Sequence, residues 1–170
     1  MALAVREMKV SEVDIVIDYF HGAPPEHLEM LGVDPTRLPT PGAWRERLHH
    51  QFSLPMNARE YLALIWLLDD APIGFSSCDK IKYGERANMH LHIVRSDKRH
   101  EGLGTEFVRR SVDIYFDLLR IKALYCEPNA LNVAPNRTLQ RAGFKYLKTH
   151  WTVPAALNYH QPVTRWVVER

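Results

Sequence analysis

Residues 88–119, NMHLHIVRSDKRHEGLGTEFVRRSVDIYFDLL, decide the fold of this chain. The first seven of these residues form an apolar-rich run that predicts a strand. Further on, apolar side chains recur at helical spacing and predict a helix whose buried face consists of Phe107, Val108, Ser111, Val112, Tyr115, Leu118 and Leu119. Between them, Gly102 and Gly104 allow a tight turn that brings amide N–H groups together at the start of the helix. Such a turn is suited to binding phosphate oxygens, although a plain strand-to-helix turn is the structural alternative.

Two familiar phosphate-binding motifs are absent from this turn. The sequence has no Gly-Lys-Ser/Thr, which excludes a Walker loop. It also has no Gly-x-Gly-x-x-Gly followed by an acidic residue about 20 positions later, so a dinucleotide fingerprint is unsupported. A nucleotide binder that uses the loop in some other way stays open as a remote alternative.

The spacing of Arg99, Gly102 and Gly104 resembles motif A of the GNAT N-acetyltransferases, and Val94 lies five residues before Arg99, as is usual in that family. The resemblance implies that the loop amides bind the pyrophosphate of acetyl-CoA and that the backbone around Ile93 and Val94 holds the thioester carbonyl. The implied cofactor-binding residues are Ile93, Val94, Arg99, His100, Glu101, Gly102, Leu103, Gly104, Thr105, Asn132 and Asn136.

A second resemblance covers residues 126–144. In GNAT proteins, the strand after the loop helix leads to an Asn, a short helix and Gly-Phe, and here Asn132 precedes Gly143-Phe144 at the usual distance. The segment is most similar to the branch that acetylates ribosomal-protein N-termini and to its small-molecule relatives. Two positions depart from the family pattern. Pro135 replaces a common Ser, and Leu139 replaces the Tyr that often protonates the leaving thiolate.

Together the motifs predict an α/β (α+β) fold of GNAT type, with a mixed twisted sheet of six to seven strands and about four helices in a single domain spanning residues 1–170. We expect antiparallel strands first. One parallel pair should then flank the loop helix and splay apart near Val94 and Cys126. Ser11 is interpreted as a helix N-cap, Thr40-Pro41 as a helix start, and residues 26–41 as irregular with one short helical turn. Three aromatic residues are interpreted as core rather than as a substrate site: Trp44, Tyr61 and Trp66.

Transfer of an acetyl group to an amine needs a general base, because an amine is protonated at neutral pH. Histidine has a suitable pKa, and alternation back from Val94 places His92 and His90 on one face of the strand. One of the two is therefore the predicted base, although both could instead be structural histidines of the sheet. Alternatives are Glu85 or Glu127 acting through water, and three tyrosines are candidate acids: Tyr125, Tyr146 and Tyr159.

Composition narrows the functional class. The chain has 170 residues, of which 46% are hydrophobic and 25% charged, as is ordinary for a globular protein. The net charge of +2 and the scattered basic residues argue against a nucleic-acid partner. No apolar run is long enough to span a membrane, and Cys78 and Cys126 lack metal-type spacing. We therefore expect a cytoplasmic protein without a metal.

The resemblance implies an acetyl-CoA-dependent N-acetyltransferase in which a primary amine attacks acetyl-CoA directly in a ternary complex. The acceptor would be a small-molecule amine or a protein N-terminus, and a homodimer stays open. The alternative is a non-catalytic module of the same fold that binds CoA or acyl-CoA. Acceptor choice should depend on residues 22–57 and 151–161, where the resemblance is weakest.

Overall fold

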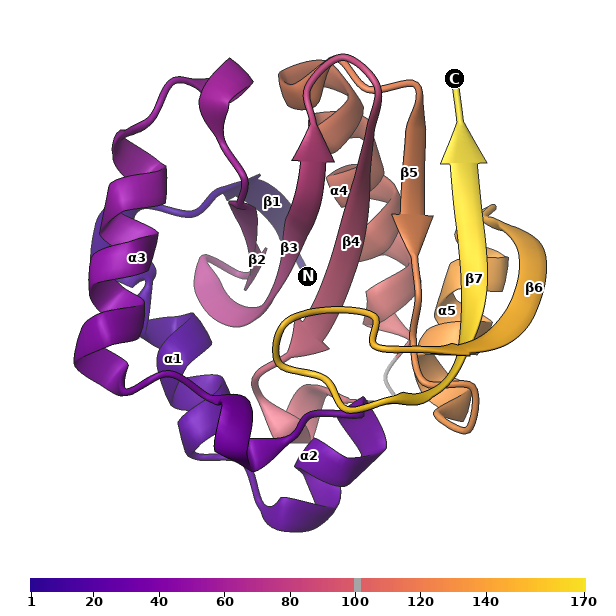
Figure 1. Cartoon of the computed structure of the whole chain (residues 1–170). Helices are drawn as coiled ribbons and strands as arrows, with labels where there is room; N and C mark the ends of the chain where they lie inside the picture. Colours follow the sequence, from indigo (N-terminus) through magenta and orange to yellow (C-terminus); the bar gives the residue numbers. More distant parts are fainter. Residues whose placement is uncertain (100–101) are drawn as a thin grey trace.

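The computed structural model describes residues 1–99 and 102–170, and Figure 1 shows the course of the chain. The seven strands are β1 (Leu3–Glu7), β2 (Leu62–Leu68), β3 (Ala71–Lys82), β4 (Arg86–Ile93), β5 (Ala123–Cys126), β6 (Lys145–Thr152) and β7 (Gln161–Glu169). The five α-helices are α1 (Asp14–His21), α2 (Pro25–Leu31), α3 (Pro41–Ser53), α4 (Leu103–Leu119) and α5 (Val133–Arg141).

All seven strands form one mixed sheet in the order β1-β2-β3-β4-β5-β7-β6. Every neighbouring pair is antiparallel except β4 and β5, which are parallel and are connected through α4. The predicted sheet is confirmed, and the described residues form five α-helices rather than about four. The predicted splay is also present, because β4 and β5 pair only as far as Met89 and Cys126, whereas β4 continues to Ile93.

Helices cover both faces of the sheet, and each face has its own core. Along β2 the side chains alternate, so that Leu64 and Trp66 pack in the core beneath α4, whereas Ala63 packs in the core beneath α1 and α3. Trp66 donates a hydrogen bond from Nε1 to Ser111 Oγ of α4 at 2.9 Å, and its ring stacks on Phe107. The aromatic residues interpreted from the sequence as core therefore do not lie together, because Trp44 and Trp66 are on opposite faces of the sheet.

The N-terminal region differs from the prediction at two points. Ser11 does not cap α1, because it lies inside a 3₁₀ helix (Val10–Glu12), and α1 begins at Asp14. Residues 26–41 are less irregular than expected, because α2 forms there. Pro25 occupies the first turn of α2, where a missing N–H costs nothing, and Gly32 ends the helix with φ of +73°.

The predicted helix start at Thr40-Pro41 is confirmed. The Thr40 side chain accepts a hydrogen bond from the Ala43 N–H at 3.3 Å, and Pro41 is the first residue of α3. This cap fixes the end of α3 that lies near α1, so it helps to place Trp44 over the sheet. Within the described residues, no helix is long and apolar enough to cross a membrane.

Candidate active site

A cleft of about 790 Å³ lies where β4 and β5 part. Its walls come from the end of β4, the glycine loop, the start of α4, the start of α5 and, across the opening, α1 and α2. We call this cavity the cleft. Seven of the predicted cofactor-binding residues line it: Ile93, Arg99, Gly102, Leu103, Gly104, Thr105 and Asn132. Asn132 lies at the start of α5, so the two separate motifs meet here.

Gly102 and Gly104 play different structural roles in this loop. Gly102 precedes α4 with φ of +74°, a conformation that is strained for any residue with a side chain. Gly104 lies in the first turn of α4 and faces α5. A Cβ at Gly104 would lie 3.6 Å from Thr138 Cγ2, which is ordinary contact, so the fold itself would accept alanine there. Because Gly104 and Thr138 both line the cleft, a larger side chain would narrow it.

The edge of β4 that faces the cleft carries backbone groups without a β5 partner. The Val94 N–H donates to the Ile73 carbonyl at 2.7 Å, so Val94 faces β3. Because successive residues of a strand direct their backbone groups to opposite sides, Ile93 faces the cleft, beyond the last residue of β4 that pairs with β5. The Ile93 carbonyl accepts a hydrogen bond from Arg99 Nε at 3.1 Å. Of the two residues around which the backbone donor was expected, Ile93 is thus the one whose backbone groups face the cleft.

Three arginines line the cleft, of which only Arg99 was predicted. Arg137 and Arg141 come from α5, one helical turn apart. This spacing was visible in the sequence, but nothing local showed that this face of α5 meets the glycine loop. Their charges and the start of α4 make the cleft favourable for phosphate groups.

Two other predicted residues have different places. Val94 packs against the core beneath α1 and α3. Asn136 is not among the residues that line the cleft. Its side-chain nitrogen donates to the Asn132 carbonyl at 2.8 Å, and its oxygen accepts hydrogen bonds from Thr164 and, at 3.0 Å, from Trp166. Asn136 thus joins α5 to β7. His100 and Glu101, also predicted, lie outside the described residues.

Another cavity, of about 440 Å³, lies beside the cleft and is called the second cavity from here on. Its floor is β3 and β4, and α1, α3 and residues 155–158 form its walls. Trp44 and Tyr61, interpreted from sequence as core, both line it. The cleft and the second cavity share Leu31 and His92, so His92 lies where the two cavities meet.

His92 is held as a neutral imidazole. Burial lowers the pKa of His92 to about 3, and positive charge from His90, His27 and Arg99 contributes. Its ring packs among the rings of Tyr19, Phe20 and Phe75, with centroids 4.9–5.2 Å away. Its Nδ1 is buried without a protein hydrogen-bond partner. A group with so low a pKa is a poor proton acceptor for an amine.

His90 has the opposite environment and lines the second cavity. Its Nε2 lies 2.9 Å from Asp79 Oδ1, on the neighbouring strand β3. Burial lowers the pKa of His90, but the charge and hydrogen bond of Asp79 raise it more, so that it lies above the ordinary value. Burial raises the pKa of Asp79, but the charge and hydrogen bond of His90, together with the charge of Lys80, lower it more, so that it lies below the ordinary value. The two side chains therefore form an ion pair when His90 is protonated, and Asp79 orients the ring when it is neutral.

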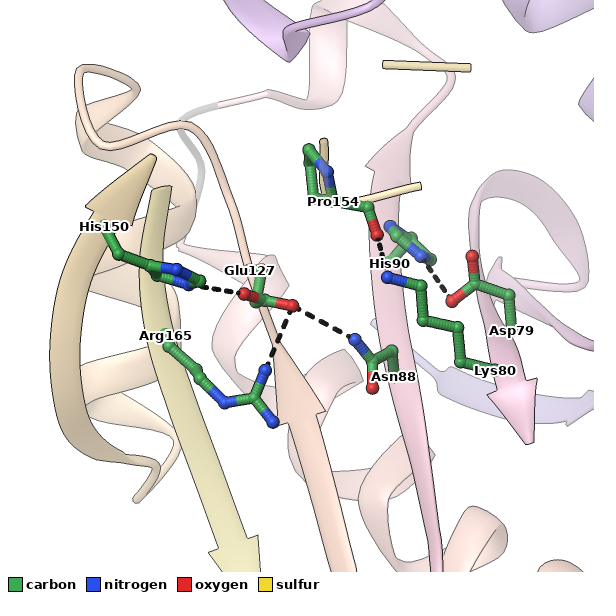
Figure 2. Close-up of polar contacts among 8 residues, drawn as sticks. All are labelled: Asp79, Lys80, Asn88, His90, Glu127, His150, Pro154 and Arg165. Carbon is green, nitrogen blue, oxygen red and sulfur yellow. Dashed lines mark hydrogen bonds and ion pairs between the residues drawn. The ribbon is translucent and has the colours of Figure 1, made fainter. Parts of the chain in front are cut away.

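Figure 2 shows that Glu127 is the centre of a separate polar cluster. Its carboxylate accepts hydrogen bonds from Asn88 at 3.2 Å and from His150 at 2.9 Å, and Arg165 lies 3.3 Å away. The side chain is only 5% exposed and lines neither cavity. Glu127 joins β4, β5, β6 and β7 beyond the end of β5, so it has little freedom to act as a base. Glu85, the other candidate, lies in the exposed turn between β3 and β4, paired with Lys82.

The tyrosine best placed for proton transfer was not predicted. Tyr19 of α1 lines the cleft, its ring contacts that of His92, and its hydroxyl lies 2.7 Å from His27 Nε2. Tyr125, Tyr146 and Tyr159 line neither cavity. Leu139, at the family's usual acid position, is fully buried in the core beneath α4. In the described part of the chain, no group of three or more His, Cys, Asp or Glu side chains is arranged to hold a metal ion.

Comparison with known proteins agrees with this geometry. A family model described as an acetyltransferase (GNAT) domain matches residues 6–145. A comparison with curated proteins gives no match. Among solved structures, aminoglycoside acetyltransferase AAC(6')-Ib with coenzyme A is 17% identical, with a TM-score of 0.74 over 99% of this chain and 95% of that chain.

Two further structures are similar in fold. The ribosomal L7/L12 acetyltransferase RimL with coenzyme A is 13% identical, with a TM-score of 0.77 over 99% of this chain and 94% of that chain. Spermidine N-acetyltransferase from Vibrio cholerae, with CoA and spermine, is 14% identical, with a TM-score of 0.74 over 98% and 95%. At these identities the likeness shows a shared fold, and it leaves the acceptor unassigned.

Proposed function

The chain belongs to the GNAT acetyltransferase domain family, whose model matches residues 6–145, and on this premise we propose that it transfers the acetyl group of acetyl-CoA to a primary amine. The observation that carries the proposal is the meeting of the two cavities at His92. One cavity suits a phosphate-bearing donor. The other is lined by the titratable His90, two residues from His92 on the same face of β4, so donor and acceptor would be bound next to each other.

The residues of the cleft fit acetyl-CoA. Gly102, Gly104 and the first turn of α4 would hold the pyrophosphate, and the arginines of the cleft would add charge. The open edge of β4 at Ile93 would hold the pantetheine arm and orient the carbonyl. Acetyl-CoA would supply an activated acetyl group as a thioester.

His90 is the proposed base. The amine must lose one proton before its lone pair can attack, and neutral His90 accepts that proton directly or through water. The hydrogen bond to Asp79 fixes the orientation of the ring and stabilises the imidazolium that forms. We propose that His92 contributes as a neutral hydrogen-bonding group at the junction, because its low pKa makes it a weak base.

Tyr19 is the proposed proton donor to the leaving thiolate. The new C–N bond replaces the C–S bond, and the sulfur leaves with the bonding electron pair and takes a proton from Tyr19. The attacking nitrogen then gives up its second proton, which restores the Tyr19 hydroxyl. Burial raises the pKa of Tyr19, which keeps its hydroxyl protonated but makes it a weaker acid, so the proposed transfer depends on its place in the cleft rather than on its acidity. The hydrogen bond to His27 holds it in place.

The non-catalytic alternative keeps acetyl-CoA binding and lacks turnover. Leu139 favours the non-catalytic alternative, because this buried leucine occupies the position where the family often has its acidic tyrosine. The decisive experiment measures free CoA release with a panel of primary amines and, separately, acetyl-CoA binding by calorimetry. We expect the protein to bind acetyl-CoA and to release CoA when a suitable amine is present. We expect His90→Ala to lower turnover by about 10²–10⁴-fold with little change in acetyl-CoA affinity. Binding without release by any amine would favour the non-catalytic module.

Gly104→Val tests the cofactor assignment separately. The branched side chain should weaken acetyl-CoA binding about tenfold or more, about 1.4 kcal/mol, because it occupies space in the cleft. Gly42→Val is the matched control. Gly42 also lies in the first turn of a helix, a Cβ there meets nothing within 4 Å, and it lines neither cavity. Equal affinities in the two folded variants would contradict the assignment. Cytoplasmic location and a homodimer stay predictions.

A further inference from the structure

The second cavity has a polar floor and apolar walls. The floor strands carry Ser77 and Asp79 on β3 and His90 on β4. The walls present large apolar side chains, of which the main ones are Phe20, Trp44, Leu48 and Leu157, together with the polar side chains of Gln51, Tyr61 and Asn158. Gln51 Oε1 already accepts hydrogen bonds from the Glu60 and Tyr61 N–H groups, and Asn158 Nδ2 donates to the Gly32 carbonyl. Such a cavity suits a ligand with a single polar end, because most of its wall is apolar and offers no partner to further polar groups.

Charge in the second cavity is balanced rather than acidic. Its carboxylates are Asp79 and Glu60, and Asp79 is already paired with His90. Arg47 lines the mouth with the opposite charge to Glu60, and both are exposed. No row of free carboxylates is present among the described lining residues. A ligand with several ammonium groups would therefore bury at least one of them without a counter-charge, at a cost of several kcal/mol.

The cavity is also closed on one side by residues 155–161, which we call the strap. The Leu157 carbonyl accepts a hydrogen bond from the Asp34 N–H at 2.8 Å, Asn158 Nδ2 donates to the Gly32 carbonyl at 2.9 Å, and the Tyr159 hydroxyl donates to the Glu29 carbonyl at 3.0 Å. Gly32 also accepts from Gln161 Nε2 at 2.8 Å. The strap thus joins α2 firmly and limits the length of any ligand.

From these observations we propose that the acceptor is a small primary amine with one amino group on an apolar, preferably aromatic, body. The amino group would lie against His90, and the body would fill the space between α1, α3 and the strap. A cavity of about 440 Å³ is of the size that small molecules occupy. This inference rests on the proposed function. It separates this chain from the structural neighbours whose names specify aminoglycosides or spermidine.

The test compares phenethylamine with spermidine and kanamycin, using the full chain and saturating acetyl-CoA. We expect kcat/KM to be at least about 100-fold higher for phenethylamine, because the polycations must bury an unpaired charge. A peptide with a free N-terminus is included as a fourth acceptor. Equal or higher kcat/KM for spermidine, kanamycin or the peptide would overturn the inference and leave the acetyltransferase assignment standing.

A second measurement does not depend on turnover. Calorimetry with CoA-saturated protein should detect phenethylamine binding and no spermidine binding. If phenethylamine binds and no amine releases CoA, the ligand class is supported and the proposed activity is wrong. If phenethylamine does not bind, the ligand class is wrong.

A pair of variants localises the effect. Ala155 of the strap lines the second cavity and is partly exposed, so Ala155→Phe should fill the cavity without damage to the core. We expect about a tenfold higher KM for phenethylamine, because overfilling a cavity costs at least about 1 kcal/mol. Val153→Phe is the control, since Val153 is exposed and lines neither cavity. Equal KM values in the two variants would place the amine elsewhere and overturn the inference.

Discussion

His90 Nε2 lies 2.9 Å from Asp79 Oδ1, across the ladder between β4 and β3. His90 lies three residues before the end of β4 that leads into the glycine loop, and it lines the second cavity. The pair therefore places a carboxylate next to a histidine of that cavity. The sequence indicated the histidine but not its partner, because Asp79 belongs to a different strand. The pair explains why the pKa of His90 is raised whereas that of His92, on the same face of β4, is lowered.

Asp79→Asn should change the pH dependence of turnover. The Asp79 carboxylate raises the pKa of His90, so its loss lowers that pKa. The base is active when neutral, and kcat/KM should therefore rise with pH through the pKa of His90. In the variant this rise should occur at lower pH, with a reduced plateau because His90 becomes a weaker base. Asp113→Asn, on the exposed side of α4 and paired with Arg170, is the control and should keep the wild-type profile. An unchanged profile in Asp79→Asn would exclude His90 as the base.

Gly102→Ala and Gly84→Ala should have similar effects on stability and different effects on ligand binding. Both glycines have positive φ, +74° and +79°, and a Cβ at either meets nothing within 4 Å. Each variant should lose about 1 kcal/mol of unfolding free energy from the strained backbone. Chemical denaturation measures this loss. Only Gly102→Ala should weaken acetyl-CoA binding, because Gly84 lies in the turn between β3 and β4, away from the cleft. Equal acetyl-CoA affinities would argue against the loop as the binding site.

His92→Phe should reduce the acid sensitivity of the fold. The unfolded chain binds a proton at His92 below about pH 6.5, whereas the folded chain does so only near pH 3. The unfolded state therefore binds more protons in this window, and stability falls as the pH decreases, by up to about 4 kcal/mol from this group. Phenylalanine has no such proton, and it suits the surrounding rings.

Denaturation curves between pH 7 and pH 4 measure the effect. The fall in stability should be shallower for His92→Phe than for the wild type. His49→Gln, an exposed histidine of α3, should keep the wild-type slope. The same slope in all three proteins would mean that His92 is not buried in neutral form.

Tyr19→Phe should slow turnover without loss of the cofactor. The variant keeps the ring that contacts His92 and removes the hydroxyl that lies near His27. We expect kcat to fall about 100-fold, the lower end for loss of a general acid, with acetyl-CoA affinity unchanged. Tyr125→Phe, outside both cavities, is the control. Wild-type kcat in Tyr19→Phe would leave protonation of the thiolate to solvent.

Local sequence patterns were sufficient to predict the strand and the helix on either side of the glycine loop. The period of α4 and the glycine spacing depend on neighbouring residues, so the parallel pair and its splay could be predicted. The segment of α2 was expected to hold only one short helical turn, but the full helix also had local signals, since Pro25 starts it and Gly32 stops it. A proline is favourable in the first turn of a helix, so Pro25 is a start signal of the same kind as Pro41 of α3.

Residues that reach the site by tertiary packing were not predictable. Tyr19 lies more than 70 residues before the glycine loop, and only the packing of α1 on β4 brings it to the cleft. Arg137 and Arg141 depend on the contact between α5 and α4 in the same way. The second cavity requires residues 29–34 and the strap to meet, and nothing in either segment alone indicates the other.

The strap also affects the order in which the protein can fold. Its hydrogen bonds to Gly32 and Glu29 join residues 126–130 positions apart, which makes them among the most non-local contacts described in the molecule. Closing such long loops is slow and carries a large entropic cost before any contact forms. During synthesis, α1, α2 and α3 emerge long before the strap that completes their cavity. The side of the protein that holds the second cavity should therefore be the last part to become native, after the sheet strands β1 to β4 have paired.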